Sequence, residues 1–144
     1  MRIGAGNGRD EAPNNAARAR PAGAKAAFQT LSDKISATDP ATKVKATVAM
    51  QQKDWGTWGV LELSNVKGPL KCSLIAVGKN GERETMSTWA VPKWGYGIPD
   101  AKAEEAKAPL YAQGGAAFKP NEIDHFEVMT FDGKKLVQVD AWLS

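Results

Sequence analysis

The sequence has little of the chemistry that metal proteins and redox proteins use. It contains one cysteine, Cys72, and one histidine, His125, in 144 residues. One cysteine excludes an intramolecular disulfide, and one cysteine with one histidine cannot form a zinc site of the usual spacing. We therefore expect no metal and no cofactor. Cys72 lies in a strand-like run, where a free cysteine behaves as a small buried hydrophobe.

Catalytic motifs are also missing. A nucleophile needs a general base within hydrogen-bond reach, and the only histidine lies inside the strand-like segment Ile123–Val128. We expect His125 to be a surface or half-buried polar residue. There is no Gly-x-Ser-x-Gly, His-Glu-x-x-His or Walker loop, and acidic pairs such as Glu82 and Glu84 are expected on solvated faces. The sequence predicts a protein that is not an enzyme.

Long apolar runs and a basic folded region are absent as well. No run approaches the roughly 18 residues that span a bilayer, and the first residues lack the apolar core of a signal peptide. Residues 1–37 hold six basic and three acidic groups, and the other 107 residues hold thirteen of each. Nucleic-acid binding needs clustered Lys and Arg. We therefore expect no nucleic-acid partner, no anchor and no export signal in this sequence.

The N-terminal part differs in composition from the rest. Residues 1–35 are rich in Ala, Gly, Asn, Arg and Pro and lack sustained apolar periodicity. Such a segment buries too little apolar surface to offset the entropy of ordering it. The sequence predicts a flexible basic tail or linker over 1–35 and a folded domain over 36–144. Within the tail, only Ala22–Leu31 has a weak helical tendency.

The rest of the chain alternates with the period of strands. Lys43–Met50 places Val44 and Val48 on one face, and Thr57–Val66 behaves alike. Two further pairs of strand-like segments flank an Asn-Gly or Asp-Gly dipeptide, the residues of a two-residue type I′ hairpin turn. These pairs are Cys72–Gly78 with Glu82–Val91, and Asp124–Phe131 with Lys134–Trp142. Ala101–Ala108, between two prolines, is predicted to be at most a short surface helix.

These elements predict an all-β domain. Six to seven short antiparallel strands with little helix are typical of an immunoglobulin-like β-sandwich, with a small β-barrel as the alternative. The Cys…Trp…Cys pattern of true immunoglobulin domains is missing, so only the architecture is predicted.

Aromatic residues are the strongest candidates for a binding site. Five of the 144 residues are Trp, and Trp55, Trp58, Trp94 and Tyr96 occur in two short clusters. They either fill the core and cover strand ends, because one Trp buries about 150–250 Å², or form an exposed patch that stacks on sugars or peptides. Trp55 and Trp58 are three residues apart, so a regular strand would place them on opposite faces.

A series of phrases, in order along residues 36–140, resembles the extracytoplasmic C-terminal domain of Streptomyces-type, membrane-bound anti-sigma factors of actinobacteria. The phrases are Ser36–Thr42, Trp55–Thr57, Leu61–Ser64, Cys72–Gly78, Gly81–Glu84, Trp89–Pro92, Gly95–Gly97, Gly114–Gly115, Ile123–Val128 and Phe131–Gly133.

The resemblance implies a sensory domain on the outer face of the cell membrane. It would modulate an extracytoplasmic-function sigma factor through protein contacts. The family's zinc-binding anti-sigma domain and transmembrane helix have no counterpart in these residues, so sigma binding transfers to none of them. Residues 1–35 would then correspond to the linker after the membrane helix, or the domain would act alone. The alternative function is a free-standing carbohydrate- or peptide-binding module that uses the exposed aromatics.

Overall fold

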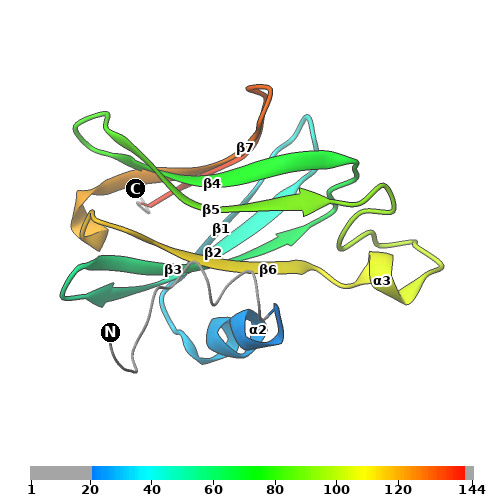
Figure 1. The fold of residues 1–144 in the computed structure, drawn as a ribbon, viewed down its shortest axis with the longest axis horizontal. Helices are drawn as coiled ribbons and strands as arrows, with labels where there is room; N and C mark the ends of the chain where they lie inside the picture. The colour runs from blue at the N-terminus through cyan, green and yellow to red at the C-terminus, as the bar shows by residue number, and fades with distance from the viewer. Residues whose placement is uncertain (1–20, 142–144) are drawn as a thin grey trace, which may run out of the picture.

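The protein is a sandwich of two four-stranded antiparallel sheets (Figure 1). The computed structural model describes residues 21–141. The first sheet has the order β1 (Lys34–Thr38), β2 (Lys45–Lys53), β3 (Gly56–Ser64), β6 (Leu110–Ala116). The second has the order β5 (Arg83–Val91), β4 (Leu70–Gly78), β7 (Ile123–Thr130), β8 (Lys135–Asp140). The predicted β-sandwich is confirmed, with eight strands in residues 21–141 instead of six to seven, and these two separate sheets exclude the barrel.

The strand order is that of an immunoglobulin-like sandwich with one additional edge strand. Immunoglobulin domains pair strands A, B and E in one sheet and strands C, F and G in the other, and some add a strand C′ to the second sheet. If β2, β3 and β6 are taken as A, B and E, the second sheet, β5-β4-β7-β8, has the order C′-C-F-G. β1 is the additional strand and pairs with β2. The likeness to immunoglobulin domains therefore includes the strand order as well as the two layers.

The core between the sheets is made by alternate residues of the strands. Val48 of β2 and Leu61 of β3 are directly opposite each other and fully buried, as are Leu74 of β4 and Val128 of β7. Phe126 is the largest fully buried side chain. Because strand side chains alternate between faces, the period-two pattern of the sequence places these residues inward, as predicted.

Hydrogen bonds join the two sheets along both sides of the sandwich. Beside β5 and β6, the backbone N–H of Ala117 donates to Oε1 of Glu84 at 2.6 Å. On the other side, the hydroxyl of Thr42 donates to the carbonyl of Leu136 at 2.6 Å. Glu84 was predicted on a solvated face; it is half-buried and holds a strand end.

Both predicted hairpins are present, but the predicted turn type is wrong. In the β4–β5 turn only Gly81 has a positive φ, 87°, and its N–H donates to the carbonyl of Gly78 at 2.9 Å. The β7–β8 turn repeats this, with φ 97° at Gly133 and a bond from its N–H to the carbonyl of Thr130 at 3.0 Å. These are three-residue loops, a type I turn followed by a left-handed glycine.

The structure also differs from the prediction of a tail over residues 1–35. Helix α2 (Pro21–Thr30) lies on the outer face of the first sheet, and β1 begins at Lys34. Ala24 is fully buried and Phe28 is 7% exposed, in a cluster with Ala49 and Val60. This packing buries enough apolar surface to order the helix, which the composition of residues 1–35 did not indicate. Residues 1–20 lie outside the described residues.

The other helices are short. Helix α3 (Glu104–Lys107) confirms the predicted surface helix between two prolines, and the 3₁₀ helix η1 (Pro120–Glu122) precedes β7. Among residues 21–141 we find no helix with the length and apolar character needed to cross a membrane.

Candidate functional site

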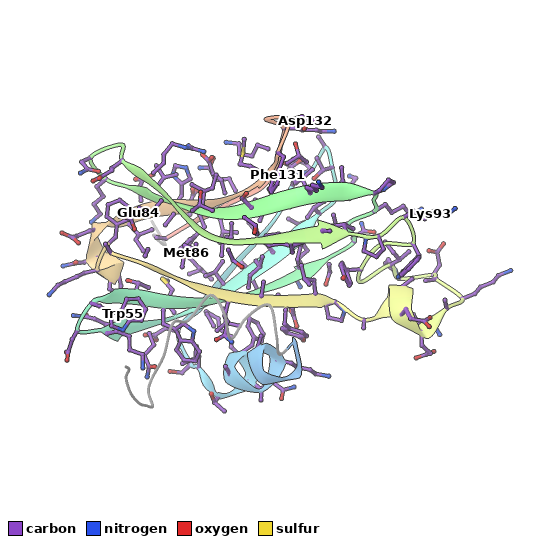
Figure 2. The ribbon with its side chains drawn as sticks, viewed as in Figure 1. Trp55, Glu84, Met86, Lys93, Phe131 and Asp132 are labelled. Atoms are coloured by element: carbon purple, nitrogen blue, oxygen red, sulfur yellow. The ribbon has the colours of Figure 1, made fainter. Side chains whose placement is uncertain are left out.

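The most distinctive surface feature is an aromatic site at the end of the first sheet where β3 begins. Trp55 precedes β3 and is 49% exposed (Figure 2). Its six-membered ring lies over Gly115 of β6: a Cβ on Gly115 would be 2.7 Å from Cζ3 of Trp55. Trp58 pairs directly with Gly115 across the sheet. Because paired residues point to the same face, both indoles lie on the outer face of the first sheet.

This arrangement corrects the expectation that Trp55 and Trp58 occupy opposite faces. That expectation required a regular strand through both residues, but β3 begins only at Gly56. Gly56 has φ 144°, and a Cβ there would lie 2.0 Å from the carbonyl oxygen of Ala116. The close backbone approach at this glycine brings the turn against β6, which places the Trp55 ring over the sheet.

Trp58 is held in one orientation by polar partners. Its indole N–H donates to Oε1 of Gln113 at 2.9 Å. The Nζ of Lys53 lies 5.4 Å from its ring centroid, within the range of a cation–π contact. Trp58 also packs against the cluster under α2. It therefore lies between the helix and Trp55. Lys53, Gln113 and Gly115 were not among the predicted site residues; the strand pairing that assembles them joins distant segments.

The other two predicted aromatics lie at the opposite end of the sandwich. Tyr96 forms a β-bridge with Val66, beyond the last residue of β3, and packs against the main core. Trp94 is 55% exposed in the same loop. Since β3 has nine residues at about 3.3 Å each, roughly 25 Å or more separates the two pairs. Trp55, Trp58, Trp94 and Tyr96 therefore do not form one patch.

A second polar cluster lies on the outer face of the second sheet. His125 has its Nδ1 2.7 Å from Asp124 Oδ2 and its Nε2 2.8 Å from Glu127 Oε2. The other oxygen of Glu127 accepts a bond from the Arg83 guanidinium at 2.7 Å. Two carboxylates around one ring fit a doubly protonated imidazolium. The half-buried position predicted for His125 is confirmed, whereas the sequence did not indicate these partners.

The charges in this cluster shift each other's titration. Burial alone would lower the pKa of His125, but the hydrogen bonds to Asp124 and Glu127 outweigh it and raise the pKa above the ordinary 6.5. Burial alone would raise the pKa of Glu127, but the bonds from Arg83 and His125 hold it below the ordinary 4.5. Opposite charges close together favour both ionised forms. The cluster is a mutually satisfied ion network, and no nucleophile is hydrogen-bonded to His125.

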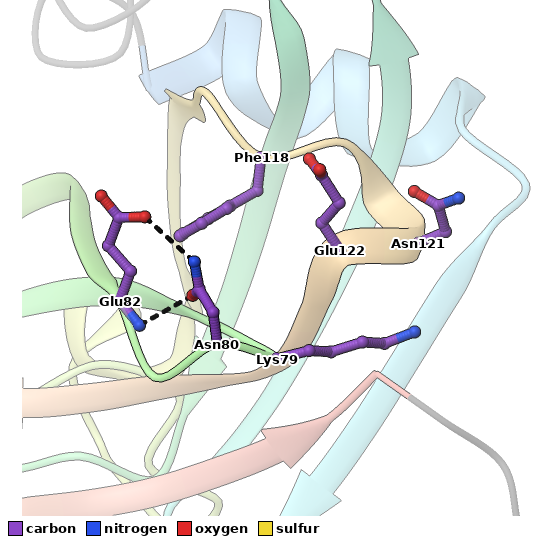
Figure 3. Close-up of a pocket in the computed structure, with 6 residues that line it drawn as sticks. All are labelled: Lys79, Asn80, Glu82, Phe118, Asn121 and Glu122. Carbon is purple, nitrogen blue, oxygen red and sulfur yellow. Dashed lines mark hydrogen bonds between the residues drawn. The ribbon is translucent and has the colours of Figure 1, made fainter.

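A shallow depression lies between the β4–β5 turn and η1 (Figure 3). Phe118 forms its apolar side, and Asn80 and Glu82 are joined by two bonds, Glu82 N–H to Asn80 Oδ1 at 2.9 Å and Asn80 Nδ2 to Glu82 Oε1 at 3.3 Å. These bonds stabilise the turn itself. Asn80 and Glu82 are therefore engaged with each other within the loop.

Cys72 is fully buried and free, as predicted. Burial raises the pKa of its thiol to about 11, and the nearby charge of Asp132 adds to this. Within residues 21–141 no group of three or more His, Cys, Asp or Glu side chains is placed to hold a metal ion.

Comparisons with protein-family models, with curated proteins and with solved structures find no match to this chain.

Proposed function

We propose that this chain is a non-catalytic recognition domain that binds its ligand at the Trp55–Trp58 site. The observation that carries the proposal is the position of Trp55, half-exposed yet held over Gly115 at a spacing that leaves no room for a side chain. A large exposed aromatic in a fixed position supplies contact area at a low entropic cost on binding.

The surroundings of Trp55 support the same proposal. Trp58 beside it is oriented by Gln113 and Lys53, so two indoles are presented with defined geometry. Trp residues are frequent among the few side chains that dominate binding energy. Trp94, by comparison, lies in a loop at the far end, and its partner Tyr96 packs against the core.

Binding selections with matched variants test the proposal. Wild-type protein and the Trp55→Ala and Trp94→Ala variants are screened against a glycan array and a displayed peptide library. Since Trp55 and Trp94 have similar exposure, 49% and 55%, both variants should remain folded. We expect ligands selected by the wild-type protein to lose binding to Trp55→Ala and to keep it with Trp94→Ala. Ligands that bind Trp55→Ala normally would contradict the proposal.

The resemblance over residues 36–140 supports a regulatory setting for this recognition. In that setting the domain is the extracytoplasmic sensory part of an anti-sigma system. The ligand or protein partner bound at the Trp55–Trp58 site then modulates release of the sigma factor. The support is the ordered phrases of the sequence alone. Reading the codons upstream of Met1 tests it: an in-frame membrane segment and a His-x-x-x-Cys-x-x-Cys motif are expected, and an adjacent in-frame stop codon would count against it.

A further inference from the structure

We infer that the ligand of the Trp55–Trp58 site is a neutral carbohydrate, with one pyranose ring packed on Trp55. This inference rests on the proposed function and adds the chemical class of the ligand. It follows from the kind of surface that Trp55 offers, from the balance of charge around it, and from a backbone N–H next to the edge strand that is already hydrogen-bonded.

The first argument is the open aromatic ring. Trp55 contacts β6 at Gly115 and is still 49% exposed. The face of an indole carries negative potential, which attracts the weakly positive C–H groups that cover one side of a pyranose ring. Trp58 is a poorer platform because Lys53 lies over its ring at 5.4 Å and its N–H is already bonded to Gln113. Trp55 is therefore the stacking residue.

The second argument is the charge of the site. Lys53 and the exposed Asp54 precede Trp55 directly and carry opposite charges. Gln51, which pairs with Trp58 and so lies on the same face, is exposed and adds a neutral amide that both donates and accepts. An anionic polymer would need clustered basic groups, and a cationic peptide would need clustered acidic groups. A neutral polyol matches this mixture, since its hydroxyls bond to amide, ammonium and carboxylate alike.

The third argument separates a sugar from an extended peptide. Extended peptides commonly bind by adding a strand to an open sheet edge. The edge strand at this site is β6, and the residue after it, Ala117, already donates its N–H to Glu84 of β5. This bond, at the site's end of the strand, uses a backbone donor that strand addition would require. Stacking on Trp55 needs no backbone donor.

The test is a titration of the full chain with neutral oligosaccharides. Binding is measured by Trp fluorescence and by NMR of the indole N–H groups. The panel contains α- and β-linked glucose, mannose, galactose and N-acetylglucosamine oligomers. We expect at least one series to bind, with Trp55 as the indole that shifts most. Trp55→Ala should weaken that binding about tenfold or more, equivalent to about 1.4 kcal/mol. Trp94→Ala should bind like the wild-type protein.

The outcomes distinguish failure of the carbohydrate inference from failure of the recognition function at Trp55. If the panel gives no binding while the peptide library yields Trp55-dependent peptides, the carbohydrate inference is overturned and the recognition function at Trp55 stands. If neutral sugars bind equally to wild-type and Trp55→Ala protein, the site is wrong and both fall. Preference for sulfated or uronic oligomers over neutral ones would also overturn the inference, because it would require a net positive site.

Discussion

Trp55 and Gly115 come from segments 60 positions apart in the numbering, and nothing larger than a hydrogen atom fits between the Gly115 backbone and the Trp55 ring. A methyl group on Gly115 would lie 2.7 Å from Cζ3 and 2.9 Å from Cη2 of Trp55. The glycine is therefore part of the aromatic site, although it has no side chain.

Replacing this glycine should displace the indole. Gly115→Ala is expected to move Trp55 away from β6, to shift its indole N–H resonance, and to cost about 1–3 kcal/mol of unfolding free energy through overpacking. NMR and urea denaturation measure the two effects. Gly59→Ala is the control, since the one atom closer than 3.9 Å to a Cβ there is the flexible end of Met86, at 2.8 Å. An unchanged Trp55 resonance in Gly115→Ala would show that the ring is not held by this contact.

Helix α2 should depend on one aromatic side chain. Phe28 packs on Tyr111 with ring centroids 5.5 Å apart, and Nζ of Lys34 lies 4.4 Å from its centroid. Phe28→Ala removes most of the apolar contact of a small cluster and should cost about 3 kcal/mol. Hydrogen exchange should show protection lost in Pro21–Thr30 while β3 stays protected. Lys25→Ala, exposed on the same helix, should change stability by less than about 0.5 kcal/mol.

The His125 network should make stability depend on pH in a defined direction. The folded pKa of His125 is raised, so its contribution is fully present below pH 6.5 and is lost as the pH rises through the folded pKa. The folded pKa of Glu127 is lowered, so its contribution is present above pH 4.5 and is lost as the pH falls through the folded pKa. Stability from this network is therefore greatest between about pH 4.5 and 6.5.

Thermal unfolding at several pH values measures this dependence. The wild-type Tm should fall between pH 6 and pH 8, and His125→Gln should remove most of that fall. Gln keeps a hydrogen-bonding group at the position but has no titration in this range. A variant with the same slope as the wild-type protein would show that another group is responsible.

Cys72 should be unreactive until the protein unfolds. It is fully buried between the sheets, and its thiol pKa is about 11, so the reactive thiolate is scarce at neutral pH. Alkylation by iodoacetamide at pH 8 should be slow in buffer and fast in denaturing guanidinium. Because access requires opening of the core, Phe126→Ala should accelerate the native reaction, whereas Trp94→Ala should not.

Local patterns predicted most of the strands. The alternation around Val48 and Leu61 identified the core face of β2 and β3 because one side of each strand meets the core. The glycines at 81 and 133 marked both hairpins because each takes a positive φ. The turn type was wrong because the dipeptide rule assumes two left-handed residues, whereas Asn80 and Asp132 keep negative φ and a third loop residue completes each turn.

The weak helical tendency of Ala22–Leu31 did not predict that helix α2 packs on the first sheet, because the apolar surface that the helix covers belongs to another part of the chain. Its own sequence is rich in alanine and carries one large apolar residue, Phe28. The surface that it covers is formed by Ala49 and Val60, which point away from the main core. In a strand read alone, Val60 looks like an outward residue. The burial of Phe28 could be predicted only together with that of Ala49 and Val60, because the helix and these two strand residues cover each other.

The sequence identified the Trp residues of the aromatic site but did not predict that they share one face of the sheet. Trp55 and Trp58 were identified from the cluster itself, but their common face depends on where β3 begins and on a glycine of β6. Trp94 and Tyr96 were grouped with them by composition, while the length of β3 separates the pairs. Pairing between distant strands is the information that the sequence pattern lacks.

The strand order has a consequence for how the chain folds. Leu63 of β3 pairs with Leu110 of β6, and the whole β4–β5 hairpin lies between them in the chain. Likewise β4 pairs with β7 across the intervening β5 and β6. Neither sheet can be completed from one contiguous segment, so loop-closure entropy must be overcome before the central pairs form. Refolding should be slow, on the order of milliseconds to seconds, and both sheets should appear in a single kinetic phase.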